Sequence, residues 1–341
     1  MKFALGRRIL PWLTVGLLAL PLLLAPPVAV AAPSLADVQV QVQLLQEEAA
    51  SAAEGAQSAK VELANLSKTL ASVKQEAAVQ GSTVAKLKAS LGAIAIEQYK
   101  SGGLSQSLEL LFSADPTLYL SAAGSLDALT RRKSLQLHRY AAAQQRLNAT
   151  TLTVNDKLAL VAAAQARITK QLATAQYKLK AAEILLTKLK KSDRARLAKL
   201  ALMKENADHA SSLKFAKSAS GISGRAGVAL KFALAQIGDW YVFGAAGMVY
   251  WDCSGLTMRA YQKAGVSMPH SAAAQARYGK YVPLNALKPG DLVFFGNPIG
   301  HVGIYLGNHR MVNAPHTGAR VKVDSFSSWF GNERFVAARR F

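Results

Sequence analysis

Two short stretches near the C-terminal end decide the fold: Asp252-Cys253-Ser254-Gly255-Leu256 and Gly300-His301-Val302-Gly303-Ile304-Tyr305-Leu306. The first predicts a helix start, because Asp252 is a good N-cap and Gly265 supplies a stop after small and apolar residues at four-residue spacing. The second alternates between apolar and other residues, which indicates a strand. With the buried strand expected at 291–295, they predict an α+β domain over residues 226–341.

Cys253, the single cysteine, falls in the first turn of this helix, where unpaired backbone N–H groups and the helix dipole favour the thiolate. The thiolate is a nucleophile, although this stretch taken alone also fits an inert core cysteine. His301 heads the strand face opposite the apolar one and stands beside glycines, as a general base that needs access would. We therefore predict that Cys253 and His301 form a pair for nucleophilic catalysis.

A third group should orient the imidazole of His301, and two residues qualify, Asn313 and His316. With a three-residue hairpin loop, Asn313 lies diagonally beside His301 on the same face, and His316 points away. A loop one residue shorter would reverse this, because a one-residue slip flips every side chain. The register that favours Asn313 has the loop Gly307-Asn308-His309, with Leu306 paired to Arg310.

The N-terminal part differs in composition. Residues 1–31 have a basic start, an apolar run and a small-residue end, typical of a cleaved secretory signal; an uncleaved membrane anchor is the alternative. Residues 32–215 are rich in Ala, Leu, Lys, Gln and Ser and predict a long antiparallel coiled-coil hairpin, with helices to about residue 100 and from about 120 to 213. A short apolar piece at 108–112 lies between them, and residues 216–225 form a flexible linker.

The overall composition restricts the classes of site and of partner that the protein can have. The 341 residues carry 41 Lys+Arg against 20 Asp+Glu, a formal charge of +21, which indicates a large polyanionic partner. A single cysteine excludes an intrachain disulfide framework and a thiolate metal cluster, and there is no glycine-rich phosphate loop. We expect no metal and no cofactor. Nucleic acid is a poor candidate partner, because the chain carries an export signal and has no aromatic-basic recognition motif.

The C-terminal residues resemble the NlpC/p60 cell-wall endopeptidases. The resemblance covers nearly all of residues 226–341 and rests on four ordered motifs: Gly238-Asp239-Trp240-Tyr241-Val242-Phe243-Gly244, the Asp252–Leu256 stretch, Leu287-Lys288-Pro289-Gly290-Asp291-Leu292-Val293-Phe294-Phe295, and the Gly300–Tyr305 stretch. It implies a papain-like core, a cysteine nucleophile and peptidoglycan stem peptides as substrate. Cleavage would fall between D-glutamate and the following diamino acid.

The resemblance also assigns roles. The family's third polar residue lies twelve positions after the histidine, which is Asn313 here, and its tyrosine corresponds to Tyr241, whose hydroxyl would hold the substrate carbonyl or the oxyanion. Asp252 and Ser254 would contact polar groups of the peptide. Two positions depart from the family pattern: Gly244-Ala245 replaces the usual Gly-Gly, and His270 replaces an arginine. Both line the expected cleft, so they put substrate details in doubt more than catalysis.

The hairpin resembles the coiled coils that precede this domain in some secreted endopeptidases, where they are associated with a division-linked membrane complex and with restraint of the active site. A plain spacer through the wall is the alternative. We predict a secreted or wall-located cysteine endopeptidase that meets peptidoglycan and anionic wall polymers, with residues 226–341 alone more active than the full-length mature protein. Two other functions remain open: an amidase at the muramic acid to L-alanine bond, and a non-catalytic activator of another hydrolase.

Overall fold

The computed structural model describes residues 34–100, 116–218 and 221–341. The predicted signal segment, residues 1–31, and the apolar piece at 108–112 lie outside them. Within the described ranges, no helix is long and apolar enough to span a bilayer.

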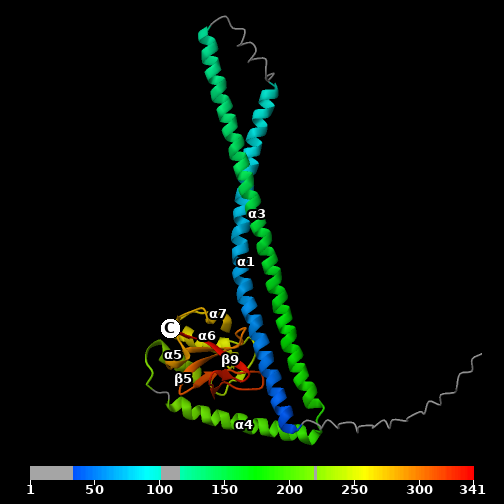
Figure 1. Ribbon diagram of the computed structural model, residues 1–341, viewed down its shortest axis with the longest axis vertical. Helices are drawn as coiled ribbons and strands as arrows, with labels where there is room; N and C mark the ends of the chain where they lie inside the picture. The colour runs from blue at the N-terminus through cyan, green and yellow to red at the C-terminus, as the bar shows by residue number, and fades with distance from the viewer. Residues whose placement is uncertain (1–33, 101–115, 219–220) are drawn as a thin grey trace, which may run out of the picture. The chain divides into compact units, whose positions relative to one another are not determined.

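The N-terminal region is an antiparallel pair of long helices, as predicted (Figure 1). Helix α1 is Leu35–Lys100 and helix α3 is Pro116–Thr187. The two helices run in opposite directions. Lys133 of α3 contacts Gln98 of α1, and further along α3, Arg167 contacts Glu62 and Lys178 contacts Glu48. The buried seam is thin because small side chains dominate it: Ala49, Ala53, Ala56, Ala59, Ala164, Ala175 and Ala182.

The prediction of one continuous second helix over about residues 120–213 is wrong, because the structure has two helices there. Helix α3 ends at Thr187, and a separate helix α4, Lys191–Ser218, follows after residues 188–190. Helix α4 packs on the C-terminal domain, where Ser212 is fully buried, and this tertiary contact overrides a composition that favours one continuous helix. The predicted linker at 216–225 is also too long, because α4 extends to Ser218 and α5 begins at Gly224.

The C-terminal domain is an antiparallel sheet in the order β3-β9-β4-β5-β6-β7, with β8 paired to β9. A small parallel pair, β1 and β2, lies between the helices α5 and α6 in chain order. The elements are α5 (Gly224–Leu234), β1 (Trp240–Tyr241), β2 (Tyr250–Trp251), α6 (Cys253–Lys263), α7 (Ala272–Gln275), β3 (Lys280–Tyr281), η1 (Leu284–Ala286), β4 (Leu292–Phe295), β5 (His301–Gly307), β6 (Arg310–Asn313), β7 (Lys322–Ser325), β8 (Trp329–Phe330) and β9 (Glu333–Arg340).

The core lies on both faces of this sheet, which confirms the predicted α+β class. Helices α5 and α6 cover one face, where Leu230 and Leu256 pack against Val302 and Ile304 of β5. The other face holds a second, aromatic cluster around Phe295. The side chains of β5 therefore alternate between the two clusters as predicted, and this alternation fixes the direction of His301 at the start of the strand.

The hairpin that carries His301 and Asn313 has a different loop from the predicted one. Asn308 and His309 form a two-residue turn with φ values of 51° and 53°, and Gly307, not Leu306, pairs with Arg310. An irregularity between Tyr305 and Gly307 absorbs the shift, so Ile304 still pairs with Val312. The shorter loop consequently does not reverse the faces of the strand.

Candidate active site

Asp252 fixes the start of helix α6. Its carboxylate accepts hydrogen bonds from the backbone N–H groups of Gly255, at 2.6 Å, and Gly244, at 2.8 Å, which makes it the predicted N-cap. Gly265 follows the helix at a φ of 78°, as the predicted stop. Cys253 is thereby held in the first turn of α6 and is buried, with 3% of its surface exposed.

His301 and Asn313 meet on neighbouring strands. The Oδ1 atom of Asn313 lies 3.1 Å from Nε2 of His301, and because a carboxamide oxygen can only accept, Nε2–H is the donor. The imidazole stacks on the ring of Phe330, with 5.0 Å between ring centroids. His316 is turned elsewhere, with its Nδ1 3.0 Å from the carbonyl of Thr317. Of the two residues that the sequence left open, the structure brings Asn313 to His301.

The remaining predicted site residues surround the sulfur. The backbone N–H of Val302, next to His301, is hydrogen-bonded to Cys253. Tyr241 is buried beside the thiol, and burial together with the nearby Cys253 raises the pKa of its hydroxyl. Ser254 is fully buried. The bond from Val302 therefore brings the start of β5, which carries His301, next to the start of α6, which carries Asp252, Cys253 and Ser254.

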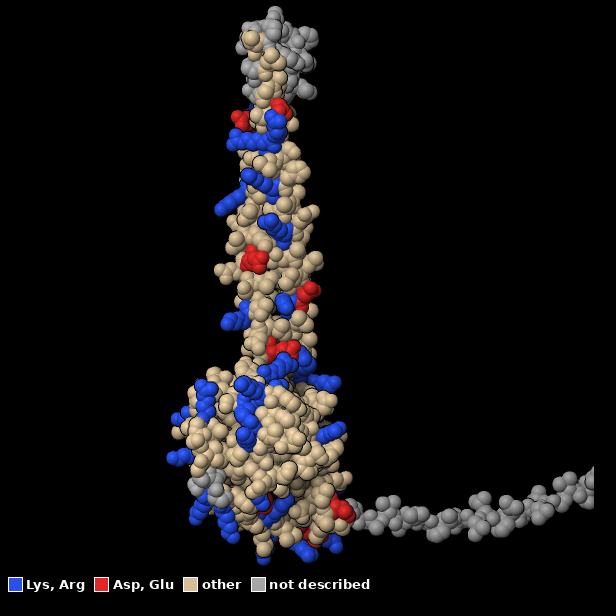
Figure 2. Space-filling view, turned by 60° about the vertical axis from the view of Figure 1, so that its left-hand side comes forward, with Lys and Arg blue, Asp and Glu red and all other residues tan. Residues whose placement is uncertain are grey.

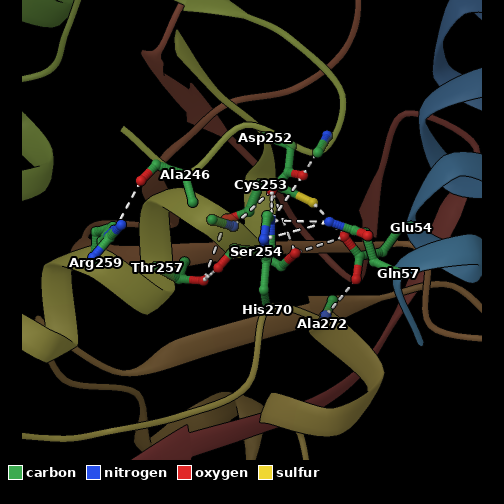
Figure 3. Close-up of polar contacts among 12 residues, drawn as sticks. Glu54, Gln57, Ala246, Asp252, Cys253, Ser254, Thr257, Arg259, His270 and Ala272 are labelled. Carbon is green, nitrogen blue, oxygen red and sulfur yellow. Dashed lines mark hydrogen bonds and ion pairs between the residues drawn. The ribbon is translucent and has the colours of Figure 1, made fainter. Parts of the chain in front are cut away.

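Helix α1 also reaches this site, through a residue, Glu54, that the sequence did not single out. Glu54, with only 2% of its surface exposed, accepts hydrogen bonds from the hydroxyl of Ser254 at 2.8 Å and from the backbone N–H of Ala272 at 2.5 Å. The thiol of Cys253 donates to the same carboxylate at 3.5 Å. Figure 3 shows the Glu54 side chain reaching from the ribbon of α1 toward the sulfur.

One turn along α1, further contacts reach the loop that carries His270. The side-chain amide of Gln57 lies 3.3 Å from Nδ1 of His270, and the hydroxyls of Ser58 and Ser271 are 2.8 Å apart. Nε2 of His270 forms an ion pair with Asp252 at 2.8 Å. Burial opposes the charge on His270, but the hydrogen bond and charge of Asp252 prevail and raise its pKa. The position where the family has an arginine thus keeps a basic group.

A signal for Glu54 exists in the sequence in retrospect. Residues 49–59 read Ala-Ala-Ser-Ala-Ala-Glu-Gly-Ala-Gln-Ser-Ala, in which Glu54 and Gln57 are the only long side chains. Small residues let a helix approach another surface closely, so the two long polar side chains are the ones that reach into it. Nothing in this segment, however, indicates which surface it meets.

The burial of this site sets the protonation states. Burial, the carboxylate of Glu54 and Asp252 together raise the pKa of Cys253, which overturns the expectation that the helix start favours the thiolate here. Burial lowers the pKa of His301 to about 4. Burial and the charge of Asp252 raise the pKa of Glu54 to about 7. With α1 in place, the cysteine and the histidine are both neutral at pH 7.

Helix α1 leaves almost no room beside the imidazole. The cavity next to His301 has a volume of about 20 Å³, close to that of a single water, and Glu47, Ala50 and Ser51 of α1 form one of its walls. A peptide cannot enter this space while α1 occupies it. The described residues contain no cluster of three His, Cys, Asp or Glu side chains that could hold a metal ion.

Comparison with known proteins identifies the family of the C-terminal domain. Residues 238–340 match the NlpC/P60 family, and this part of the chain is an NlpC/P60 domain. It is 41% identical over 103 residues to a protein of Mycobacterium tuberculosis named a probable endopeptidase, 41% identical over 96 residues to "Probable endopeptidase p60" of Listeria monocytogenes, and 40% identical over 79 residues to "Peptidoglycan endopeptidase RipA" of M. tuberculosis. The matches cover 30%, 28% and 23% of this chain and only 27%, 20% and 17% of those relatives.

Solved structures of the same family are also similar. An NlpC/P60 family protein from Bacillus cereus is 27% identical, with a TM-score of 0.32 over 34% of this chain and 39% of that one. The P60 domain of an antigen from M. avium subspecies paratuberculosis is 25% identical, with a TM-score of 0.31 over 34% of this chain and 93% of that one.

Proposed function

We propose that this protein is a cysteine endopeptidase that hydrolyses peptidoglycan stem peptides at the bond between D-glutamate and the following diamino acid. The observation that carries the proposal is the convergence of Cys253, His301 and Asn313 within an NlpC/P60 domain. The names of the relatives support an endopeptidase, and one of them names peptidoglycan as its substrate; the particular bond is the one that the family resemblance implies.

Each site residue has a separate role in this reaction. The sulfur of Cys253 attacks the amide carbon, and His301 takes the thiol proton and returns it to the leaving amine. Asn313 accepts from Nε2–H of His301, which leaves Nδ1 as the basic nitrogen that takes the thiol proton. Tyr241 donates to the developing oxyanion, and Asp252 and Ser254 bind polar groups of the peptide. Water then hydrolyses the thioester and regenerates the thiol.

The same geometry supports a restrained enzyme. The carboxylate of Glu54 holds the hydroxyl of Ser254 and the thiol of Cys253, two groups that the reaction needs. Its negative charge also raises the pKa of Cys253 and so disfavours the nucleophilic thiolate. The hairpin therefore acts as a gate and not only as a spacer, and activity requires that α1 leave the site.

The charge of the chain supports a place in the cell wall. Figure 2 shows Lys and Arg side chains over both the hairpin and the C-terminal domain, with few Asp and Glu side chains among them. The phosphates and carboxylates of wall polymers are the polyanions that suit this surface, and the signal-like segment at residues 1–31 provides the export route. A division-linked membrane complex is the proposed partner of the hairpin.

The test compares three forms of the full chain on purified peptidoglycan: the unaltered protein, Glu54→Ala, and Glu54→Ala combined with Cys253→Ala. Mass spectrometry identifies the released fragments. We expect new D-glutamate carboxyl ends that Glu54→Ala increases and Cys253→Ala abolishes. Muramic acid ends would instead indicate an amidase, and no release by a folded Glu54→Ala protein would indicate a non-catalytic activator.

A further inference from the structure

The third residue of the candidate triad has an orientation problem that a carboxylate would not have. A side-chain amide has one accepting oxygen and one donating nitrogen, and only the oxygen of Asn313 can serve the Nε2–H of His301. An amide flipped by 180° would place its NH₂ group against that N–H and repel it. Some other group must therefore choose the orientation of Asn313.

Asp324 is placed to make this choice. The Nδ2 atom of Asn313 donates to the carboxylate of Asp324 at 3.0 Å, and more distantly to the backbone carbonyl of Lys322 at 3.5 Å. Strand β7 carries both acceptors, in a register that pairs Asn313 with Lys322 and Met311 with Asp324. Because a carboxylate only accepts, it binds the NH₂ side of the amide and leaves the oxygen for His301.

We propose that Asp324 is a positioning residue that fixes the amide of Asn313, and through it the tautomer of His301. This inference rests on the proposed function for its effect on catalysis, but its effect on the imidazole does not depend on the substrate.

Lys322 ties this arrangement to helix α4. Its ammonium lies 3.6 Å from the carboxylate of Asp324 and 3.0 Å from that of Asp208 in α4. Glu205, also in α4, is 3.9 Å away. The hydroxyl of Ser212 accepts from the backbone N–H of Val323 at 2.9 Å. The strand that presents Asp324 is thus held by α4, so the helical region reaches the triad at two places, Glu54 and β7.

The rival explanation is that Asp324 serves only as an ion-pair partner of Lys322. The two roles predict different results for the imidazole. An ion-pair partner stabilises β7 whatever the tautomer of His301, whereas a positioning residue controls which ring nitrogen carries the proton.

The first experiment is ¹⁵N NMR of the histidine rings in the full chain, with His301→Gln to assign the signal among the six histidines. We expect His301 to be the Nε2–H tautomer in the unaltered protein and a mixture of tautomers in Asp324→Ala. Asp324→Asn is the matched variant, because its amide can either accept from or donate to Asn313, and it should give a mixture of tautomers between those of the unaltered protein and Asp324→Ala. An unchanged tautomer in a folded Asp324→Ala protein would overturn the proposal.

The second experiment is a double-mutant cycle on peptidoglycan hydrolysis, made in the Glu54→Ala background. Asp324→Ala should lower kcat about tenfold with little change in KM, the size of one lost hydrogen bond to a charged group. With Asn313→Asp already present, the two oxygens of the new side chain are equivalent, so Asp324→Ala should cause no loss. Equal losses in both backgrounds would overturn the positioning role.

The two proposals fail separately. Without any hydrolysis, the proposed function fails, while the NMR result still decides the role of Asp324. With hydrolysis but an unaltered His301 tautomer in Asp324→Ala, the endopeptidase stands and the positioning role falls.

Discussion

The carboxylate of Glu54 lies 3.5 Å from the sulfur of Cys253, although 199 positions separate the two residues in the sequence. The contact joins a helix of the N-terminal hairpin to Cys253, the proposed nucleophile of the C-terminal domain. It places a buried negative charge beside the group that must become negative in the reaction, and the predictions below follow from this contact and its neighbours.

Replacement of Glu54 should activate the thiol. Glu54→Ala removes the charge that raises the pKa of Cys253 and frees the hydroxyl of Ser254, so we expect alkylation of Cys253 by iodoacetamide to accelerate at least about tenfold at pH 7. The rate is followed by mass spectrometry of the intact protein.

The matched control is Glu62→Ala, which removes another glutamate of α1. Its partner is Arg167, and both side chains are exposed to solvent, 43% and 53%, so this ion pair contributes little to stability. Its alkylation rate should equal that of the unaltered protein. Equal acceleration by both variants would mean that any loss of charge from α1 loosens the hairpin.

Docking of α1 should weaken as the pH rises from about 5 to 8. The pKa of Glu54 is raised from 4.5 to about 7, mainly by burial, so the docked state binds this proton more tightly than an open state would. Its contribution is fully present below pH 4.5 and is lost as the pH rises through 7, a change of about 3 kcal/mol. Hydrogen exchange of residues 49–59, corrected for intrinsic rates, measures it.

Three neighbouring groups titrate in the same range. Burial raises the pKa of Glu333, beside Ser51, to about 7, which weakens docking as the pH rises. Asp252 raises the pKa of His270 against the effect of burial, but this ion pair lies within the C-terminal domain and persists when α1 leaves. Burial lowers the pKa of His301 to about 4, so this group has the opposite effect and strengthens docking as the pH rises from 4 to 6.5. Glu54→Gln removes the titration of residue 54 and should abolish most of the pH dependence of docking. An unchanged pH dependence would assign the effect to the neighbouring groups.

The choice between Asn313 and His316 can be tested directly. In the Glu54→Ala background, Asn313→Ala should lower kcat about tenfold or more, because His301 loses the acceptor that orients it. His316→Ala should change kcat less than about twofold, since its Nδ1 is engaged by the carbonyl of Thr317. The reverse order of effects would make His316 the third residue.

Gly300 offers a steric route to the open state. A methyl group at this position would overlap the side chains of Ser51 and Glu333, so Gly300→Ala should push α1 from the site without removing a charge. Alkylation of Cys253 should then accelerate about tenfold. Adding Ser51→Gly removes the atoms that Cβ would meet in α1 and should restore part of the original protection; no recovery would show that the alanine acts on His301 itself.

The sequence was informative wherever the determinant is local. The N-cap at Asp252, the stop at Gly265 and the alternation of β5 each depend on residues within a few positions, and all three are confirmed. The face of Asn313 was predicted correctly, but the loop was wrong. A shorter turn and an irregularity near Leu306 compensate each other, and neither has a clear local signal.

The features that sequence reasoning missed arise from contacts between distant segments. The break at residues 188–190 reflects the packing of α4 on the sheet, and the burial of Glu54 reflects the surface that α1 meets. The raised pKa of Cys253 follows from that same burial, since a helix dipole is outweighed by desolvation and an adjacent carboxylate.

Helix α1 is continuous from Leu35 to Lys100, so the residue that covers the sulfur and the far end of the same helix are parts of one rod. Glu54 is separated from that far end by roughly 70 Å at 1.5 Å per residue. A sideways pull at the distant end therefore acts as a torque on a lever, with a moment arm far longer than the few ångströms that Glu54 must travel to uncover the sulfur. The contacts of α1 with the C-terminal domain, among them those of Glu54 and Ser58, are what resist such a torque, so under the proposed gating a load at the far end favours uncovering the sulfur.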